Sequence, residues 1–314
     1  SEQAEGTNDF TNTADETETS FTKAWDSISG ETLPTVTFNL IRWIDGVRDT
    51  ANDPYASYDL PNTETSHTFT GLPTYSSTGA AYTYTVEEET PDGYSSEQAE
   101  GTNDFTNTAD ETEVSGSKTW QGRVDVETNP DITITLFRNG AEYATQLLTG
   151  GATTYSFTGL PTHDELGQPY TYEVQELTVP AGYTSESEPN QTNGKDFTNS
   201  YTASGTLDLS GTKTLTGREG AETDSFTFKL YSDEVSEANL LDTKTVTGGS
   251  GSFSFDQIAY TLDLQADPAV NDLGDHTYIV VEEVPTENPS NGITYDIMQY
   301  TVNVTVTDNG DGTL

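Results

Sequence analysis

The chain has 314 residues, of which 31% are hydrophobic, and it carries 11 basic against 53 acidic residues, a formal net charge of −42. This length predicts two or three domains, and 17 Tyr and 12 Phe supply apolar surface for several small cores, which excludes a disordered chain. A polyanion of this size repels nucleic acid and anionic membrane surfaces, so we expect neither as a partner.

The chain contains no Cys, although small secreted domains usually gain stability from disulfides. We therefore expect either domains that manage without a cross-link or a cross-link of another kind. No run of about 18 apolar residues is present, so we expect no membrane insertion of this segment. No signal peptide precedes Ser1, and we interpret the chain as a mature or excised piece.

An internal repeat organises the sequence. Residues 1–17 recur identically at 96–112, and we interpret them as the last strand and tail of a preceding unit. Each later unit opens with a lysine, and the spacing is 95 residues in both steps (118 − 23 and 213 − 118). These lysines are Lys23, Lys118 and Lys213. We expect three further domains, over residues 18–110, 111–203 and 204–314.

After its lysine, each unit carries a run in which apolar and polar residues alternate. The apolar residues are Val36, Phe38 and Leu40; Ile132, Ile134 and Leu136; and Phe226, Phe228 and Leu230. Period-two alternation is typical of a strand with one buried face. Gly, Pro, Asn and Asp dominate between such runs, and we find no convincing helical stretch. Several short strands per unit predict an all-β fold of tandem immunoglobulin-like β-sandwich domains in a linear array.

Two segments interrupt the pattern. Residues 44–60, together with Trp43, form an insertion found only in the first unit, which could be a ligand-binding loop or a packed crossover. The third unit ends in an acidic glycine run at 308–313. This run lacks the ligand spacing and final Glu of an EF-hand, so we interpret it as a hairpin turn.

Three kinds of polar residue are expected to face the cores. The three repeated lysines lie two residues before a large apolar residue, which places both on one strand face. An acid on a later strand shares its face with Tyr and Val in each unit; these acids are Glu88, Glu176 and Glu282. An Asn shares a face with Phe105 or Phe197; these are Asn107 and Asn199. Burying an unpaired ammonium costs several kcal/mol or forces it neutral, so each lysine needs a partner.

Two interpretations of these polar groups stay open. The first is a buried Lys–Glu ion pair with an Asn hydrogen bonded nearby, which stabilises little over an apolar replacement. The second is a self-formed amide. A desolvated lysine amine is a nucleophile, a protonated Glu polarises the carboxamide and transfers protons, and folding holds the partners in contact. Each domain would react once, so we do not expect an enzyme with turnover.

The motifs resemble those of two families. Residues 18–203 resemble the Cna protein B-type repeats of Gram-positive surface proteins, through K-x-W, F-T-G-L-P, Y-x-V-x-E, P-x-G-Y and F-T-N. The third unit resembles the streptococcal pilin isopeptide-linkage (FctA-type) domain, through K-T-L-T-G-R, F-T-F-K-L-Y, I-T-Y-D and D-N-G-D-G-T-L. The resemblance implies a sandwich in which a first-strand Lys bonds a last-strand Asn beside a catalytic Glu.

Carried over by position, the resemblance implies two complete sets of residues and one incomplete set. The complete sets are Lys23, Glu88 and Asn107, and Lys118, Glu176 and Asn199. The third unit supplies Lys213 and Glu282 without an Asn partner in this sequence. A shift of one residue in strand register would exchange the acids for their neighbours, which are Glu87, Glu89 and Glu283.

The repeats and the resemblance predict a structural stalk or pilus segment of a bacterial surface protein, located outside the cell on the cell wall or in a fibre. Its expected partners are neighbouring repeats and, in a fibre, other copies. One alternative is an adhesin whose domains bind a host or matrix ligand. Another is a fibre in which residues 1–17, with Asn12, complete the next chain's third domain and bond Lys213. A tandem array cut at arbitrary points explains the same ends.

Other chemistry has little support in the sequence. His67, His163 and His276 stand alone, without a second His or Cys at metal-ligand spacing, so we expect no metal. Neither a G-x-S-x-G elbow nor a nucleotide-binding fingerprint is present, and we expect no cofactor.

Overall fold

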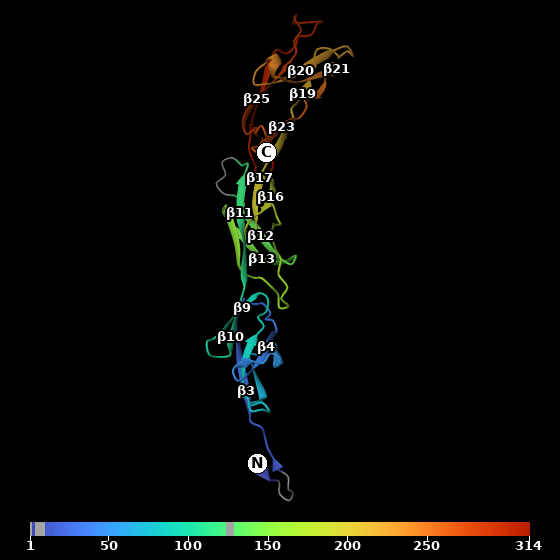
Figure 1. Ribbon diagram of the computed structural model, residues 1–314. Coiled ribbons are helices and arrows are strands. Elements are labelled where there is room, and N and C mark those ends of the chain that lie inside the picture. Colours follow the sequence, from blue (N-terminus) through green and yellow to red (C-terminus); the bar gives the residue numbers. More distant parts are fainter. Residues whose placement is uncertain (1, 4–9, 124–128) are drawn as a thin grey trace.

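The computed structural model describes residues 2–3, 10–123 and 129–314. The described residues form 26 strands and one short 3-10 helix, Glu237–Asn239. Figure 1 shows three units arranged end to end along an elongated rod, with the N-terminus at one tip. The prediction of an all-β chain of tandem β-sandwich domains is confirmed.

The first unit is a sandwich of two sheets. One sheet has the order β7 (Ser66–Pro73), β3 (Glu16–Asp26), β10 (Asp104–Ala109), β9 (Tyr94–Gln98). In the other, β4 (Val36–Ile44) pairs antiparallel with β5 (Val47–Arg48), β6 (Ala56–Leu60) and β8 (Tyr82–Glu88). The insertion therefore supplies β5 and β6, which favours the packed-crossover interpretation over the ligand-binding loop.

Alternation along β4 builds the core of this unit, as the pattern predicts. Val36, Phe38 and Leu40 are at most 1% exposed, whereas the residues between them are half-buried. Phe21 stacks on Phe38 with ring centroids 3.9 Å apart, and Phe105 meets Phe38 edge-on at 5.3 Å. Strands from both sheets thus contribute to one aromatic core.

The second unit repeats the arrangement. One sheet has the order β14 (Thr154–Pro161), β11 (Glu111–Gln121), β17 (Lys195–Tyr201), β16 (Tyr183–Pro189). The other has the order β13 (Ala141–Leu148), β12 (Ile132–Arg138), β15 (Tyr172–Glu176). Asn139 and Gly140 join β12 to β13 with φ of 50° and 79°. These left-handed values are those of a two-residue type I′ hairpin, for which Asn-Gly is the preferred sequence.

The first and last strands of each of these units lie side by side and run parallel. Lys23 is paired with Phe105 and Trp25 with Asn107 in the β3–β10 ladder. The β11–β17 ladder repeats this register from Lys118 onward. The lysine and the asparagine of one unit are therefore two residues apart in register, on adjacent strands of the same sheet.

The third unit is built differently. Its larger sheet has the order β21 (Leu240–Thr247), β20 (Ser225–Ser232), β25 (Gly274–Glu282), β26 (Gln299–Val306). Two smaller sheets comprise β19 (Ser210–Lys213) with β22 (Gly251–Ser254), and β18 (Ala203–Leu207) with β23 (Ile258–Asp263) and β24 (Val270–Asn271). Within the described residues, β19 pairs with β22 alone. The segment ending at Leu314 runs beside β18, through a parallel bridge between Ser204 and Thr313.

A small hairpin precedes the first unit. In it, β1 (Glu2–Gln3) pairs with β2 (Phe10–Thr11), and Gln3 lies opposite Phe10. The β9–β10 ladder places Gln98 opposite Phe105 in the same register. Residues 2–3 and 10–11 therefore pair in the register of the β9–β10 ladder, and residues 1 and 4–9 lie outside the described part.

Phe38→Ala should destabilise the first unit strongly, because it removes a ring at the centre of the aromatic core. We expect a loss of about 3–5 kcal/mol in the free energy of unfolding, measured by thermal denaturation. Tyr75→Ala is the matched control, since Tyr75 is 60% exposed, and it should change stability by less than about 0.5 kcal/mol. Equal effects of the two changes would contradict this assignment of the core.

Candidate functional site

A buried polar group of three side chains lies inside the first unit. Lys23 comes from β3 and Asn107 from β10 in one sheet, and Glu88 comes from the end of β8 in the other. Lys23 is 4% exposed and Asn107 is fully buried. Period-two alternation directs all three inward, because each shares a strand face with an apolar core residue.

The carboxylate of Glu88 lies between the two partners. Lys23 Nζ lies 3.2 Å from both Glu88 oxygens. Asn107 Nδ2 donates to Oε1 of the same carboxylate at 2.5 Å. One acid therefore holds an amine and a carboxamide against each other in the core.

The second unit contains the same group in the same place. Lys118 Nζ donates to Glu176 Oε2 at 3.0 Å, and Asn199 Nδ2 donates to Oε1 at 2.7 Å. Lys118 is 2% exposed and Asn199 is fully buried. The two units thus share one arrangement of Lys, Glu and Asn side chains, although the sequence around these residues differs.

Burial changes the protonation of the lysines. Desolvation lowers the pKa of Lys23 below its ordinary value, against the opposing attraction of Glu88. The pKa of Lys118 is lowered for the same reason, with Glu176 opposing. A lowered pKa increases the fraction of neutral amine, which is the nucleophilic form.

Aromatic rings cover both lysines. Lys23 Nζ lies 4.6 Å from the centroid of the Trp25 ring, and Lys118 Nζ lies 4.5 Å from that of Trp120. Tyr94 packs edge-on against Trp25 at 5.0 Å, and Tyr183 packs against Trp120 at 5.1 Å. These ring pairs shield the amines from water, which strengthens every electrostatic interaction inside the group.

The asparagine carbonyl oxygens are unpartnered. Oδ1 of Asn107 and Oδ1 of Asn199 are buried without a hydrogen bond. An unsatisfied buried acceptor costs roughly 1–3 kcal/mol. The amide nitrogens of these residues, rather than the oxygens, face Glu88 and Glu176.

Two serines complete the groups, and sequence reasoning missed them. Ser96 Oγ on β9 donates to Glu88 Oε2 at 3.0 Å, and Ser185 Oγ on β16 donates to Glu176 Oε2 at 3.1 Å. Each lies two residues after the Tyr of P-x-G-Y and therefore on the same strand face. This Tyr–Ser spacing repeats in both units, and it is the sequence signal that could have identified the two serines.

The acids that adjoin these glutamates point elsewhere. Glu87 accepts from Arg48 Nη1 at 2.7 Å, Glu89 accepts from Asn39 Nδ2 at 2.8 Å, and Glu283 accepts from Lys229 Nζ at 2.7 Å. The strand register therefore turns Glu88, Glu176 and Glu282, rather than their neighbours, toward the repeated lysines.

The third unit holds only the acid and the amine. Lys213 Nζ lies 2.7 and 2.9 Å from the two oxygens of Glu282. The backbone N–H of Asp296 donates to Glu282 Oε2 at 3.2 Å. Phe226 takes the place of the tryptophan, with its ring centroid 4.3 Å from Lys213 Nζ. The structure brings no Asn side chain to this pair within the described residues.

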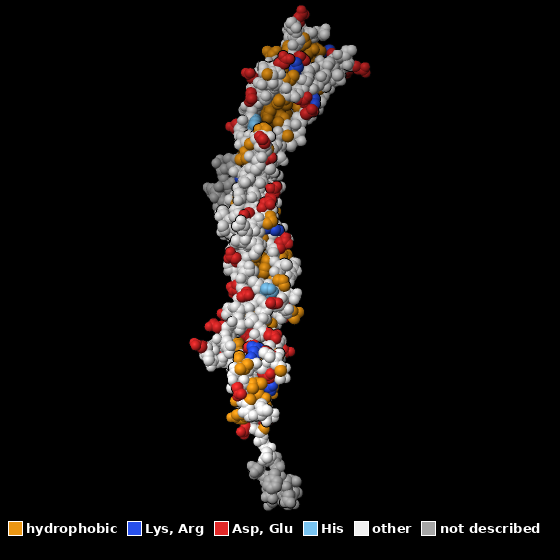
Figure 2. Space-filling model, in the orientation of Figure 1, with side chains coloured by type: hydrophobic (Ala, Val, Ile, Leu, Met, Phe, Trp, Pro, Cys, Tyr) orange, Lys and Arg blue, Asp and Glu red, His pale blue; other side chains and the backbone are white. Residues whose placement is uncertain are grey.

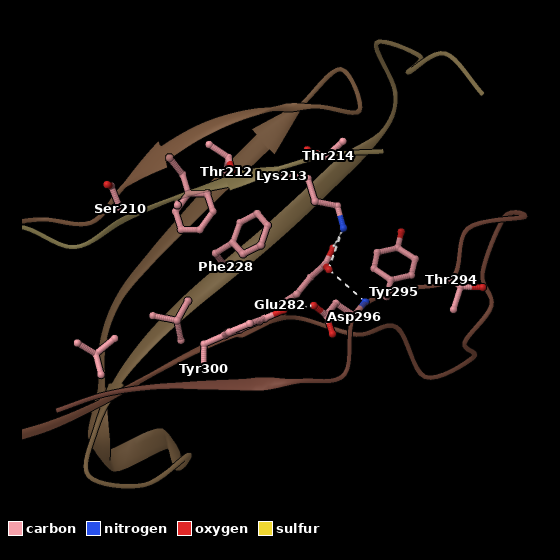
Figure 3. A pocket seen from close by; sticks show the side chains of 14 residues that line it. Ser210, Thr212, Lys213, Thr214, Phe228, Glu282, Thr294, Tyr295, Asp296 and Tyr300 are labelled. Carbon is pink, nitrogen blue, oxygen red and sulfur yellow. Dashed lines mark hydrogen bonds and ion pairs between the residues drawn. The ribbon is translucent and has the colours of Figure 1, made fainter. Parts of the chain in front are cut away.

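A cavity of about 640 Å³ lies beside this pair (Figure 3). Polar groups of β19 line one wall, and Phe228, Tyr295 and Tyr300 are among its other residues. One edge of β19 has no strand partner among the described residues. In the first two units, β10 and β17 occupy the corresponding edge of β3 and β11.

Asn12 does not reach any of the three groups in this chain. It is exposed and follows β2, before β3 begins at Glu16. Across residues 2–3, 10–123 and 129–314, no set of three His, Cys, Asp or Glu side chains is placed to hold a metal ion. No helix in that part is long and apolar enough to cross a membrane.

Figure 2 shows acidic side chains along all three units, with few basic ones among them. Some described acids form isolated pairs with a base, such as Lys195–Glu173 at 2.9 Å and Arg218–Asp224 at 2.8 Å. Exposed pairs of this kind contribute little to stability. The main electrostatic effect of the acidic surface is therefore its summed negative potential, which opposes association with other anions.

Two family models match the chain. The Cna protein B-type domain matches residues 19–108 and 114–200, and the Spy0128-like isopeptide containing domain matches residues 209–314. Both resemblances expected from the motifs are thereby confirmed. No curated protein matches the chain.

Solved structures of surface proteins are similar to the chain. A single B repeat unit (B1) of the collagen binding surface protein of Staphylococcus aureus is 26% identical, covering 60% of this chain and 99% of that one, with a TM-score of 0.26. Two B repeat units of the same protein are 22% identical, covering 86% and 69%, with a TM-score of 0.28. A major pilin of Streptococcus pyogenes is 12% identical, covering 59% and 96%, with a TM-score of 0.28.

Glu282→Ala should destabilise the third unit, because it leaves the half-buried Lys213 ammonium without its partner. We expect a loss of about 1–3 kcal/mol in the free energy of unfolding, measured by calorimetry. Glu283→Ala is the neighbouring control, since it breaks the exposed Lys229–Glu283 pair and should cost at most about 1 kcal/mol. Replacing Lys213 by Met and Glu282 by Leu together should recover most of the loss. Wild-type stability of Glu282→Ala would contradict the burial of this pair.

Proposed function

The chain belongs to the Cna protein B-type domain family, whose model matches more than half of its residues, and on that premise we propose that it is a load-bearing segment of a bacterial surface stalk or pilus. Intramolecular Lys–Asn isopeptide bonds lock its first two units, and it acts outside the cell. The domains extend over residues 18–110, 111–203 and 204–314, after a tail at 1–17 from a preceding repeat.

One observation carries the proposal: in two units a buried amine and a buried carboxamide bind the same buried acid. The Lys23, Glu88 and Asn107 group and the Lys118, Glu176 and Asn199 group match in partners, burial and aromatic cover. An ion pair alone does not require an asparagine whose carbonyl oxygen stays unsatisfied. A reaction between amine and carboxamide requires an asparagine at this position, with its carbonyl oxygen free to accept from a proton donor.

The reaction balances within the three side chains. The neutral Nζ of Lys23 attacks Cγ of Asn107, so the Nζ–Cγ bond forms and the Cγ–Nδ2 bond breaks. Glu88 in its acid form donates to Oδ1 and increases the positive charge on Cγ. Glu88 then passes a proton from Nζ to the leaving Nδ2, which departs as ammonia. The acid is regenerated, yet the substrate is the chain itself, so each unit reacts once.

The bond lies on the path of a pulling force. Tension enters a unit at the start of its first strand and leaves at the end of its last strand. Because β3 and β10 are parallel neighbours, a bond between Lys23 and Asn107 carries this tension directly across the sheet. The residues between them are then unloaded, so the unit does not extend.

Cross-linking also constrains the unfolded chain. The loops span 84 residue steps in the first unit (107 − 23) and 81 in the second (199 − 118). If an isopeptide bond acts as a disulfide of that loop length does, it contributes on the order of 4 kcal/mol. Unlike a disulfide, it is not reduced, which suits a chain without Cys.

A second candidate function is a fibre built by strand donation. The edge of β19 without a strand partner among the described residues, and the 640 Å³ cavity at Lys213 and Glu282, favour it. The segment Phe10–Asn12 has the same sequence as Phe105–Asn107, which lies parallel to β3 beside Lys23. In this arrangement Asn12 of one chain bonds Lys213 of the next, and the chain is the repeating subunit of a fibre.

Intact mass under denaturing conditions tests the bonds. We expect the mass to be lower than the sequence mass by two ammonia molecules, one for each complete group. Glu176→Gln should retain only the bond of the first unit and lose one ammonia, because its side chain can no longer serve as the acid. Lys195→Ala is the control, since Lys195 pairs with exposed Glu173, and it should keep both bonds. An unshifted wild-type mass would reject the proposal.

Single-molecule pulling tests the mechanical role. The wild-type second unit should not lengthen before the tether breaks. Lys118→Ala should release on the order of 300 Å of chain when that unit unfolds, since 81 residue steps extend at about 3.3–3.6 Å each. An identical extension step in wild type and variant would show that no bond carries the load.

Denaturing gels of concentrated protein test the fibre. Strand donation predicts a ladder of covalent multimers that disappears in Lys213→Ala and in Asn12→Ala. Asn107→Ala should keep the ladder, because Asn107 reacts within its own chain. A single monomer band in the wild type would reject strand donation and leave the intramolecular bonds unaffected.

A further inference from the structure

An ion pair crosses the joint between the first two units. Arg138, the last residue of β12, donates from Nη1 to Oε1 of Glu31 at 2.7 Å. Tyr143 Oη donates to the same oxygen at 3.3 Å. The side chains of Arg138 and Glu31 are 22% and 16% exposed. Salt therefore screens this contact less than a contact at the open surface.

Two tyrosine rings hold the Arg138 guanidinium in place. Its Cζ lies 4.2 Å from the ring centroid of Tyr143 and 4.3 Å from that of Tyr170. Stacking on aromatic faces orients the planar guanidinium and lowers its freedom before an acid arrives. We call Arg138, Tyr143 and Tyr170 the Arg138 clamp.

The first unit has an equivalent arginine. In each of the two units, the arginine near the end of the second strand pairs with the Tyr four residues before the central Glu. Arg42 lies opposite Tyr84 on β8, and Arg138 lies opposite Tyr172 on β15. Arg42 and Arg138 therefore hold the same position in their units, near the end of the second strand.

The equivalent arginine already has an acid from its own unit. Arg42 Cζ lies 4.4 Å from the ring centroid of Tyr55 and 4.5 Å from that of Tyr82. Its Nε donates to Oδ2 of Asp49 at 3.0 Å, and Asp49 is buried within the insertion. The second unit lacks this insertion, so its clamp takes the acid from the neighbouring unit instead.

The clamp adds to other contacts at the joint, where Gly93 also lies against His163. Asp110 is the single residue between β10 and β11; its N–H donates to Gly93 O at 2.8 Å and its carbonyl accepts from Thr162 N at 3.2 Å. This attachment belongs to the β11 sheet, whereas Arg138 belongs to the β12 sheet. An attachment through one sheet of the second unit alone would let the two units tilt relative to each other. Attachments through both of its sheets oppose such tilting.

The joint between the second and third units has the positions of acid and base reversed relative to the first joint. Here the earlier unit in the chain supplies the base and the later unit supplies the acid. Nε of Arg123 in the second unit lies 3.6 Å from Oδ2 of Asp308 in the third. Tyr201 also donates to Asp308 Oδ1 at 2.5 Å. The acidic glycine run is thus a turn that contacts the second unit. If the third unit followed the first directly, Glu31 would repel Asp308. If a copy of the second unit followed the second unit, Arg123 would repel Arg138.

We propose that the Arg138 clamp is a docking site for a carboxylate of the preceding repeat, and that Glu31 bound there fixes the angle between the first two units. The clamp makes the joint stiff, and the rod keeps its direction under load. A unit with its own acid, as at Arg42, does not need the carboxylate of a neighbour. This inference does not depend on the isopeptide bonds.

Spin-label distances in the full chain test the clamp. The chain has no Cys, so Thr70→Cys and Thr158→Cys place labels only at exposed, matching positions on β7 and β14. We expect a narrow distance distribution in the parent. Glu31→Gln should broaden it, because the neutral amide loses the attraction to the guanidinium. Tyr170→Leu should broaden it as well, because the guanidinium loses one stacking face.

Asp49→Asn is the matched control, since it breaks the equivalent pair inside the first unit, away from the joint. It should leave the distribution narrow. A narrow distribution in Glu31→Gln, or equal broadening in Asp49→Asn, would overturn the proposal. The intact mass of each variant separates this result from the proposed function, because Glu31→Gln leaves both complete Lys, Glu and Asn groups unchanged.

Discussion

The parallel pairing of first and last strands is the constraint on which the rest of the structure depends. It places Lys23 and Asn107 two residues apart in register on one sheet, facing Glu88 on the other. Separated end strands would not provide the contact, and antiparallel end strands would not place the two ends of the unit at opposite poles. The buried polar group, which would be a liability in an ordinary sandwich core, is then what makes a covalent lock possible.

Much of this arrangement could be predicted from the sequence, for identifiable reasons. Scarce lysines at equal spacing showed the repeat, and period-two alternation around Phe38 showed which strand faces are buried. The same alternation directed Lys23, Glu88 and Asn107 inward, because a strand offers only two faces. Alternation along β8 also selected Glu88 over Glu87 and Glu89, and the pairing of β8 with β4 keeps that register.

The remaining features depend on contacts between distant segments. Glu31 and Arg138 lie 107 positions apart, and neither belongs to a motif that repeats in every unit. The role of the insertion depends on the contact between Asp49 and Arg42, which no sequence motif indicates. The cavity beside Lys213 is lined by β19, which pairs with β22 alone among the described residues. Sequence patterns describe strands and their faces well, but joints and cavities arise from the way complete units meet.

Peptide mapping of the second unit tests the central claim most directly. Proteolysis of unfolded wild-type protein, followed by tandem mass spectrometry, should yield a branched peptide in which the Lys118 side chain is joined to Asn199 with loss of ammonia. The same digest of Glu176→Gln should yield the two linear peptides. Linear peptides containing unmodified Lys118 and Asn199 from the wild type would contradict the account.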